Sequence, residues 1–288
     1  MKDKPFVLSE DVEVLMGGWS MQRGFKLPPP AFYGDLLNAM NKLLENFFGT
    51  VVIAEEKIIS GQINSWVQSC GLPAISMDGV YFKSPLTIQV TRSVDAKGKD
   101  VGLLPRYGAL PLPEQVRQIS ESGIKEAVLV DDVVFSGEQA IFIIQKLLSA
   151  GVRVRKVLTG VSVGAGQKML EEFKVENLAV YQVPEVIDEV CQRDFLPGVP
   201  RSGRTVVNAG NMGMPYILPF GNPHKWASIP IASQYKFSKE CIAITMTLFE
   251  AVEKASGGKT VLCSDLGRMV FSLPHDKTRF VDALRRLL

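Results

Sequence analysis

Several kinds of residue are scarce in this chain of 288 residues, and each scarcity excludes a class of protein. The chain has two histidines, His224 and His275, and neither has a partner at metal-ligand spacing. The four cysteines lie far apart and form no C-x-x-C pair; they are Cys70, Cys191, Cys241 and Cys263. A zinc site is therefore not expected, and the pattern is typical of reduced thiols in a cytoplasm.

A surplus of one charge is also missing. Lys and Arg together number 32 against 30 for Asp and Glu, which gives a formal net charge of +2. We therefore expect no nucleic-acid partner, because no global excess of cations is present to neutralise phosphates. No apolar stretch reaches membrane-spanning length, and residues 1–10 lack the apolar run of a signal peptide. We expect a soluble, cytoplasmic protein that does not bind membranes.

Apolar residues are plentiful, at 46% of the chain, which is enough for a large core. Apolar runs that indicate strands alternate with apolar residues at helical spacing. The expected strands are residues 50–54, 73–77, 86–92, 125–130, 152–163 and 178–183. The expected helices are residues 32–47, residues 61–70 and a third between Asp132 and Gly151. This alternation predicts a Rossmann-like α/β fold with a parallel sheet and helices on both faces.

The pattern changes after residue 183. Residues 184–230 contain many Pro, Gly, Asn and aromatic residues, which predicts an irregular hood over the sheet. Two helices are expected beyond it, one beginning near Ser238 and one after Asp276 as its N-cap. The expected domains are therefore a core with an N-terminal helical segment over residues 1–183, and a hood with a C-terminal helical extension over residues 184–288.

The most informative segment joins an apolar strand, two acids and a small turn. Residues 127–130 (AVLV) predict a buried strand, and Asp131 and Asp132 lie at its carboxyl end. Ligands bind at that end of an open parallel sheet. Residues 135–139 then open a helix, where backbone N–H groups and the helix dipole favour an anion. Carboxylates beside an anion site suit a phosphosugar, because they can bind ribose hydroxyls or a divalent cation.

This segment resembles the signature of the type I phosphoribosyltransferase family, which is an apolar strand, two acids and a phosphate loop. The resemblance extends to residues 51–57 and covers about residues 30–183. It implies that Asp131 and Asp132 hold the ribose hydroxyls of phosphoribosyl pyrophosphate, together with Mg²⁺. It also implies a 5′-phosphate cradle at the positions Phe135, Ser136, Gly137, Glu138 and Gln139.

The resemblance implies roles for two cations outside the signature. Lys57 follows the strand that resembles the family's pyrophosphate loop, and it is a candidate for binding pyrophosphate. Arg106 lies within residues 93–113, a long Gly- and Lys-rich connection that also carries Lys97 and Lys99. A connection of this length is expected to act as a lid, and a cation on it would stabilise charge on the leaving group.

The acceptor base is expected to bind in the hood. Asp194 is a candidate for a hydrogen bond to the base, and Phe195 and Trp226 are candidates for stacking on it. Arg201 and Arg204 suit either a phosphate or a neighbouring carboxylate.

The function implied is transfer of a phosphoribosyl group to or from a nitrogenous base, in nucleotide metabolism. The partner is a small phosphosugar or nucleotide, and a homodimer is allowed. Three departures from the family pattern, which are Phe135, Glu138 and the lack of the usual Gly pair in the pyrophosphate loop, favour an alternative, a non-catalytic regulator that kept the pocket. Nucleotide cleavage on the same scaffold is a third alternative. Strands that end in two acids also occur in receiver-type domains, where the acids bind magnesium or cap the next helix.

Overall fold

The structure is a computed structural model that describes residues 4–288, and its chain forms two compact units. The first unit contains the residues up to Ile53, Arg92–Gly102 and Ile187–Leu288. The second unit contains Ala54–Thr91 and Leu103–Val186. Each unit has a hydrophobic core of its own. The second unit is thus built from two chain segments that are inserted into the first.

This division differs from the two consecutive domains that the sequence suggested, over residues 1–183 and 184–288. The later boundary, at Val186 and Ile187, is close to the expected one. The N-terminal segment, however, belongs with the C-terminal helices, because α2 (Pro30–Phe48) packs against α8 (Gln234–Ala255) and both contribute to one core. Helical periodicity shows that each helix has an apolar face but does not identify the helix that covers it.

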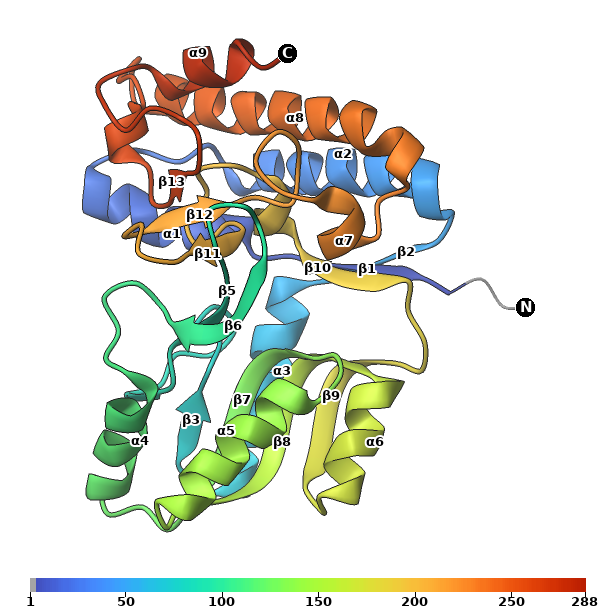
Figure 1. Cartoon of the computed structure of the whole chain (residues 1–288), viewed down its shortest axis with the longest axis vertical. Coiled ribbons are helices and arrows are strands. Elements are labelled where there is room, and N and C mark those ends of the chain that lie inside the picture. Colours follow the sequence, from blue (N-terminus) through green and yellow to red (C-terminus); the bar gives the residue numbers. More distant parts are fainter. Residues whose placement is uncertain (1–3) are drawn as a thin grey trace. The chain divides into compact units, whose positions relative to one another are not determined.

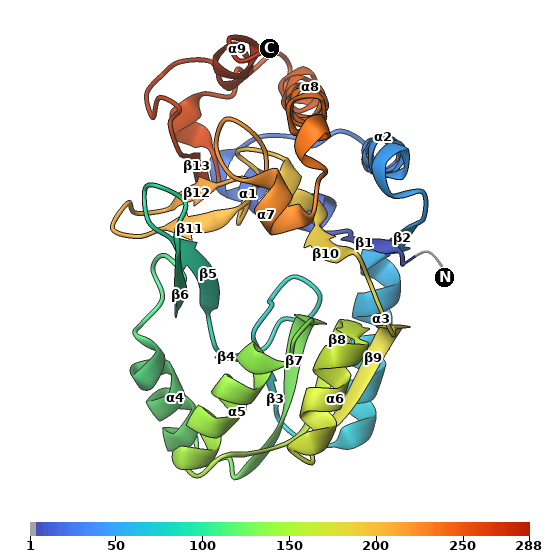
Figure 2. The same ribbon diagram turned by 45° about the vertical axis from the view of Figure 1, so that its right-hand side comes forward.

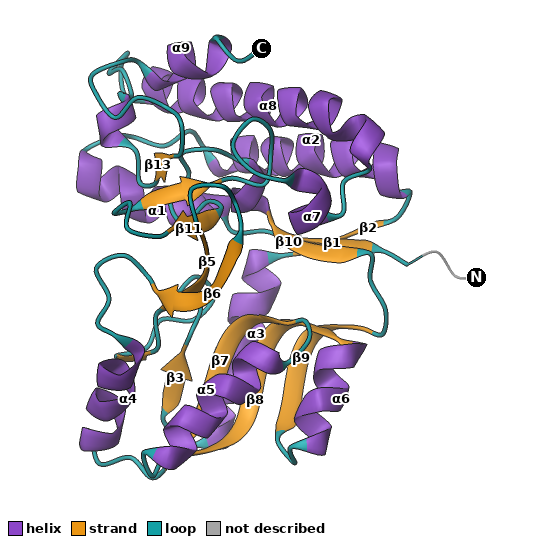
Figure 3. Cartoon of the chain, viewed as in Figure 1, coloured by secondary structure: helices purple, strands orange, loops and turns teal. Residues whose placement is uncertain are grey.

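The second unit is built on a five-stranded sheet in which every neighbouring pair of strands is parallel (Figures 1 and 3). The strand order is β4 (Leu86–Thr87), β3 (Ala74–Ser76), β7 (Glu126–Val134), β8 (Arg153–Val163) and β9 (Glu176–Val183). Helix α3 (Glu56–Cys70) covers one face of this sheet (Figure 2). The other face is covered by α5 (Glu138–Ser149) and α6 (Gly164–Glu172), with α4 (Leu112–Glu121) beside α5. The prediction of an α/β fold with a Rossmann-like parallel sheet is confirmed.

The strand order creates a topological switch point in this sheet. From β3 the chain moves outward to β4 at the edge, whereas the next strand of the sheet, β7, lies on the other side of β3. The connections that leave β3 and β7 therefore run in opposite directions. In open α/β sheets, ligands bind in the crevice at the carboxyl ends of the two strands that flank such a point.

Strand β7 is longer than predicted, because it continues through Val134. Strand β3 ends at Ser76, opposite Val130, while β7 goes on pairing with β8 through Asp131–Thr159 and later pairs. The two acids thus lie beyond the end of β3 rather than at the end of their own strand. Val133 and Val134 are β-branched and have partners in the long strand β8, which explains the extension.

The connection expected over residues 93–113 is largely ordered. Strands β5 (Val90–Val94) and β6 (Asp100–Pro105) are neighbours in a sheet, so the strand expected over residues 86–92 is replaced by β4 and β5. Asp95 closes the turn between β5 and β6, since its Oδ1 accepts the N–H groups of Lys97 and Lys99 at 2.8 and 2.9 Å. Lys97 and Lys99 therefore lie on a hairpin turn. Movement of this segment as a lid stays a prediction.

The first unit contains short strands around a large apolar core. One sheet has the order β10 (Asp188–Cys191), β1 (Phe6–Ser9), β2 (Val51–Ala54). The other has the order β13 (Met269–Val270), β12 (Met212–Met214), β11 (Arg204–Val206), β5, β6. Its further helices are α1 (Val12–Arg23), α7 (Pro223–Ala227) and α9 (Phe280–Arg285). The segment 184–230 therefore supplies strands to this unit. Within residues 4–288, no helix has both the length and the apolar character needed to cross a membrane.

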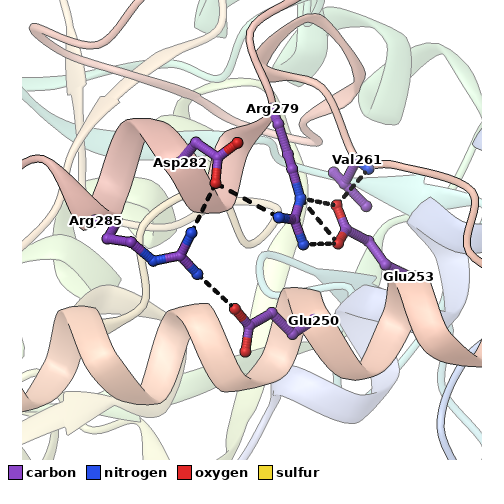
Figure 4. A network of polar contacts seen from close by, with 6 residues as sticks. All are labelled: Glu250, Glu253, Val261, Arg279, Asp282 and Arg285. Carbon is purple, nitrogen blue, oxygen red and sulfur yellow. Dashed lines mark hydrogen bonds and ion pairs between the residues drawn. The ribbon is translucent and has the colours of Figure 1, made fainter.

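The last helix, α9, begins later than predicted. Its N-cap is Arg279, and Asp276 instead accepts the N–H of Thr278 at 2.8 Å. Charged side chains join α9 and its N-cap to α8 (Figure 4). Arg279 donates from Nη2 to Glu253 Oε2 at 2.5 Å, and from Nε to both oxygens of that carboxylate at 3.1 Å.

Candidate functional site

Three carboxyl groups lie at the switch point of the second unit. Asp131 on β7 is 4% exposed and Asp132 is half-buried. Asp78 comes two residues after β3 and is also 4% exposed. The N–H of Met77 donates to the carbonyl of Val130 at 2.8 Å, which keeps the end of β3 beside β7. The two strands that flank the switch point therefore bring acids close to one another.

These neighbours and the burial strongly affect the protonation of Asp131. Burial raises the pKa of Asp131 well above its ordinary value, and the charges of Asp132 and Asp78 raise it further. The N–H of Asp132 donates to Asp131 Oδ1 at 3.0 Å, which acts in the opposite direction. A carboxyl group that keeps its proton can donate a hydrogen bond as well as accept one. Asp131 with its proton, beside Asp132, suits a ligand with several hydroxyl groups.

Asp78 is a residue that the sequence analysis missed. Its Oδ2 accepts the N–H groups of Val80 and Tyr81 at 2.7 and 2.5 Å, so the carboxylate shapes the connection from β3 to β4. The local signal was an Asp-Gly pair directly after an apolar strand, which indicates a turn. That signal does not distinguish a turn residue from a site residue. The distinction comes from the pairing of β3 with β7, which the sequence did not show.

The turn between β7 and α5 has the backbone geometry of an anion site. Gly137 is the N-cap of α5, with a φ of 82°, and as a glycine it has no side chain to cap the helix; the hydroxyl oxygen of Ser136 accepts the N–H of Glu138 at 3.4 Å. The first N–H groups of a helix lack intrahelical acceptors and carry partial positive charge, which favours an anion there. Ser136 and Glu138 are exposed at this turn, and Phe135 and Gln139 are half-buried.

Close packing on α6 fixes the orientation of this turn. A Cβ on Gly137 would lie 3.0 Å from Cβ of Met169, on α6. A Cβ on Gly166 would lie 2.6 Å from Val134 Cγ1 and 2.7 Å from the carbonyl oxygen of Phe135. Both positions therefore require glycine. A role for Gly137 was expected from the sequence, whereas none was expected for Gly166, because its spacing from Gly164 was the only signal.

Lys57 and Arg106 lie on other elements of the second unit. Lys57 is exposed in the first turn of α3, the helix that packs against β8 and β9. Arg106 lies between β6 and α4, where its backbone N–H donates to the carbonyl of Gln89 at 3.0 Å. Their catalytic roles stay predictions.

The three residues predicted to hold a base belong to the first unit. Phe195 is 0% exposed and packs edge to face on Phe237, with ring centroids 5.0 Å apart, so its ring is part of the core. Asp194 accepts the N–H of Gly203 at 2.8 Å on Oδ1. Trp226 is buried, and its ring lies beneath the guanidinium of Arg204. Binding of a base by these residues stays a prediction.

A complete metal site is not built from protein side chains in the described part of the chain. Within residues 4–288, no group of three or more His, Cys, Asp or Glu side chains is arranged to hold a metal ion. Mg²⁺, however, is usually bound by one or two carboxylates together with the phosphates of a substrate. Asp131 and Asp132 fit the protein part of such a site.

Comparisons with known proteins give partial likenesses only. No family model matches the chain, and no curated protein sequence matches it. The structure of UMP synthase from Leishmania donovani is 16% identical over 44% of this chain, with a TM-score of 0.28, and the match spans 27% of that protein. Orotate phosphoribosyltransferase from Aeropyrum pernix is 16% identical over 51% of this chain and 70% of its own, with a TM-score of 0.25. At such scores the α/β fold is established by the sheet order and register and not by these likenesses.

Proposed function

We propose that the second unit binds a phosphosugar, either phosphoribosyl pyrophosphate or a nucleotide, and that the protein transfers the phosphoribosyl group to or from a nitrogenous base. The observation that carries this proposal is the position of Asp131 and Asp132 at the switch point of the sheet. The turn at Gly137, which opens α5, follows the same strand. Acids for a sugar and N–H groups for a phosphate thus stand on one strand and the turn after it.

Each group has a distinct role in this proposal. Asp132, the more exposed acid, accepts hydrogen bonds from ribose hydroxyls, and Asp131 supports it from the buried side. The N–H groups that open α5 bind the 5′-phosphate. Mg²⁺, when bound beside the two acids, would neutralise charge on the pyrophosphate. Transfer through an oxocarbenium-like transition state relies on positioning and charge stabilisation and needs no protein nucleophile.

Calorimetric titration with phosphoribosyl pyrophosphate and Mg²⁺ tests the proposal. We expect Asp131→Asn and Asp132→Asn each to weaken binding by about 10- to 100-fold, because hydrogen bonds to charged groups contribute roughly 1.5–3 kcal/mol. Glu172→Gln removes an exposed acid at the end of α6 and is the matched control, with unchanged affinity. Unchanged affinity in both aspartate variants would remove these acids from the site and refute the proposal.

A regulator that binds the phosphosugar without turnover is the second candidate. Glu138 favours it, because this carboxylate occupies the first residue of α5, next to the proposed phosphate position. Like charges repel strongly when they are partly shielded from water. A pyrophosphate-release assay with a mixture of bases separates the candidates. Tight binding without release for any base would support the regulator, and release with one base would support the transferase.

A further inference from the structure

A second cluster of polar side chains lies within the first unit, around Arg204 on β11. Arg204 is 8% exposed, and its guanidinium lies over the rings of Trp226 and Tyr216, at 4.9 and 5.7 Å from their centroids. Its Nη1 lies 2.5 Å from Oδ2 of Asp100, the first residue of β6. The side chain of Asp100 is 47% exposed. The arginine of this cluster is thus buried, whereas the aspartate is accessible to solvent.

Two hydrogen-bond donors in this cluster have no acceptor. Nε of Arg204 and Nε1 of Trp226 are both buried without a partner. The indole of Trp19 differs, since it donates to the carbonyl of Asp265 at 2.7 Å. A buried donor without an acceptor is energetically unfavourable, and native proteins pair nearly all such groups. Two of them on side chains in contact indicate that an acceptor from outside the chain binds here.

The neighbouring groups indicate the charge of that acceptor. Burial raises the pKa of Tyr216 to about 12, so its hydroxyl keeps its proton and can donate. The charge of Asp194 also raises this pKa, whereas the charges of Arg204 and Arg92 and a side-chain hydrogen bond with Arg204 lower it. The two acids that remain nearby have partners of their own: Asp188 accepts the hydroxyl of Ser228 at 2.8 Å, and Asp194 accepts a backbone N–H. Donors on an arginine, a tryptophan and a tyrosine suit an oxygen acceptor with negative charge.

We propose that Arg204, Trp226 and Tyr216 bind a small oxyanion, a carboxylate or phosphate group, and that Asp100 occupies part of its place when no ligand is bound. Carboxylate and phosphate bind the guanidinium fork with the same geometry, so the carboxylate of Asp100 can stand in for the ligand. Asp100 directly follows the turn that Asp95 closes and is half-exposed; its Oδ1 also accepts the N–H of Gly102 at 2.8 Å, so moving the side chain into solvent requires breaking this hydrogen bond and the contact with Arg204. This site lies in the first unit and is independent of the function proposed for the second.

The indole N–H signals of the ¹⁵N-labelled full chain provide a direct test. The chain has three tryptophans, and Trp226→Phe assigns the signal of interest. We titrate with inorganic phosphate and, separately, with acetate, at constant ionic strength. The Trp226 signal is expected to shift and to saturate with at least one of the two anions, which identifies the preferred group. The Trp19 signal, whose donor already has an acceptor, is expected not to move.

Two variants test the roles of the arginine and the aspartate. Asp100→Asn removes the competing charge at a half-exposed position and should tighten binding by about fivefold to tenfold. Arg204→Lys keeps the positive charge but lacks the guanidinium fork and should abolish the saturable shift. Absence of a shift with both anions in the parent chain and in Asp100→Asn would overturn the proposal and would mean that internal water satisfies the donors. A shift that Arg204→Lys leaves intact, or one that never saturates, would also overturn it.

Discussion

Buried carboxyl groups occur in both units, but their neighbours differ. In the first unit Asp11 is 1% exposed, and burial raises its pKa to about 7 while the guanidinium of Arg193 acts to lower it. Arg193 donates to Asp11 from both its side chain and its backbone. In the second unit Asp131 is buried to a similar extent, but the next two influences on its pKa are the acids Asp132 and Asp78.

The difference separates a structural acid from a candidate site acid. A buried carboxylate with a guanidinium partner contributes to the fold, because removal of the partner leaves an uncompensated buried charge. Acids gathered beside a buried acid are unfavourable in the free protein, and such arrangements concentrate at functional sites. We therefore expect the pair of Asp11 with Arg193 to stabilise the fold, and the cluster around Asp131 to serve the ligand binding proposed above.

Arg193→Met tests the structural side of the comparison and has the largest expected effect. The variant leaves Asp11 buried without its guanidinium and should lower the free energy of unfolding by about 3–5 kcal/mol near pH 8. The loss should shrink as the pH falls, because a protonated Asp11 needs no cation. Denaturant unfolding at pH 5.5 and pH 8 measures both effects. The double variant Asp11→Asn/Arg193→Met is the control and should recover part of the loss. A loss that is the same at both pH values would contradict this account of Asp11.

Asp131→Asn tests the candidate site acid, and it should raise the free energy of unfolding rather than lower it. Because the folded-state pKa of Asp131 is raised, its contribution to stability is complete below about pH 4, the unfolded value, and is lost as the pH rises through the folded pKa. Asparagine does not titrate, so the ligand-free variant should be more stable than the parent by about 1–2 kcal/mol at pH 8. The gain should fall toward pH 4. Thermal and denaturant unfolding without ligand measure it. A variant less stable than the parent at pH 8 would mean that Asp131 serves the fold.

Local patterns predicted the elements around Asp131 well, and the long-range pairings less so. The apolar run before Asp131 and Asp132 predicted strand β7, and the spacing of Ile141, Ile144 and Leu147 predicted helix α5, which the structure confirms. Both signals depend on neighbours within a few residues. Asp78 could not be found in this way, because its proximity to Asp131 arises from the pairing of β3 with β7 across some fifty intervening residues.

The division into units was hidden for the same reason. The sequence suggested that the N-terminal helical segment belongs to the same domain as the parallel sheet. In the structure, α2 buries its apolar face against α8, near the other end of the chain. The orphaned donors of Arg204 and Trp226 are also a product of tertiary packing, since nothing in the sequence distinguishes a paired indole N–H from an unpaired one. Sequence patterns identified candidate residues, and the fold decided which of them meet.

Arg285→Ala has the smallest expected effect on the free energy of unfolding. It tests whether an ion pair stabilises the fold only when its carboxylate is buried. In the network of Figure 4, Arg285 contacts Glu250 at 2.9 Å and Asp282 at 2.8 Å, and both acids have side chains that are more than 40% exposed. Exposed pairs contribute about 0–1 kcal/mol, so the variant should lose roughly 0.5 kcal/mol or less. Salt at 0.5 M should reduce even that loss, because it screens exposed charges.

Arg279→Met is the matched comparison within the same network. Its partner Glu253 has a side chain only 9% exposed, and this carboxylate also accepts the N–H of Val261 at 2.9 Å. Arg279→Met therefore leaves the buried carboxylate of Glu253 without its cation. The loss in free energy of unfolding should be several times larger than for Arg285→Ala, and added salt should change it little. Equal losses in the two variants would mean that burial does not decide the energy of these pairs. The contrast between Asp11 and Asp131 would then lose its physical basis, because it depends on the same distinction.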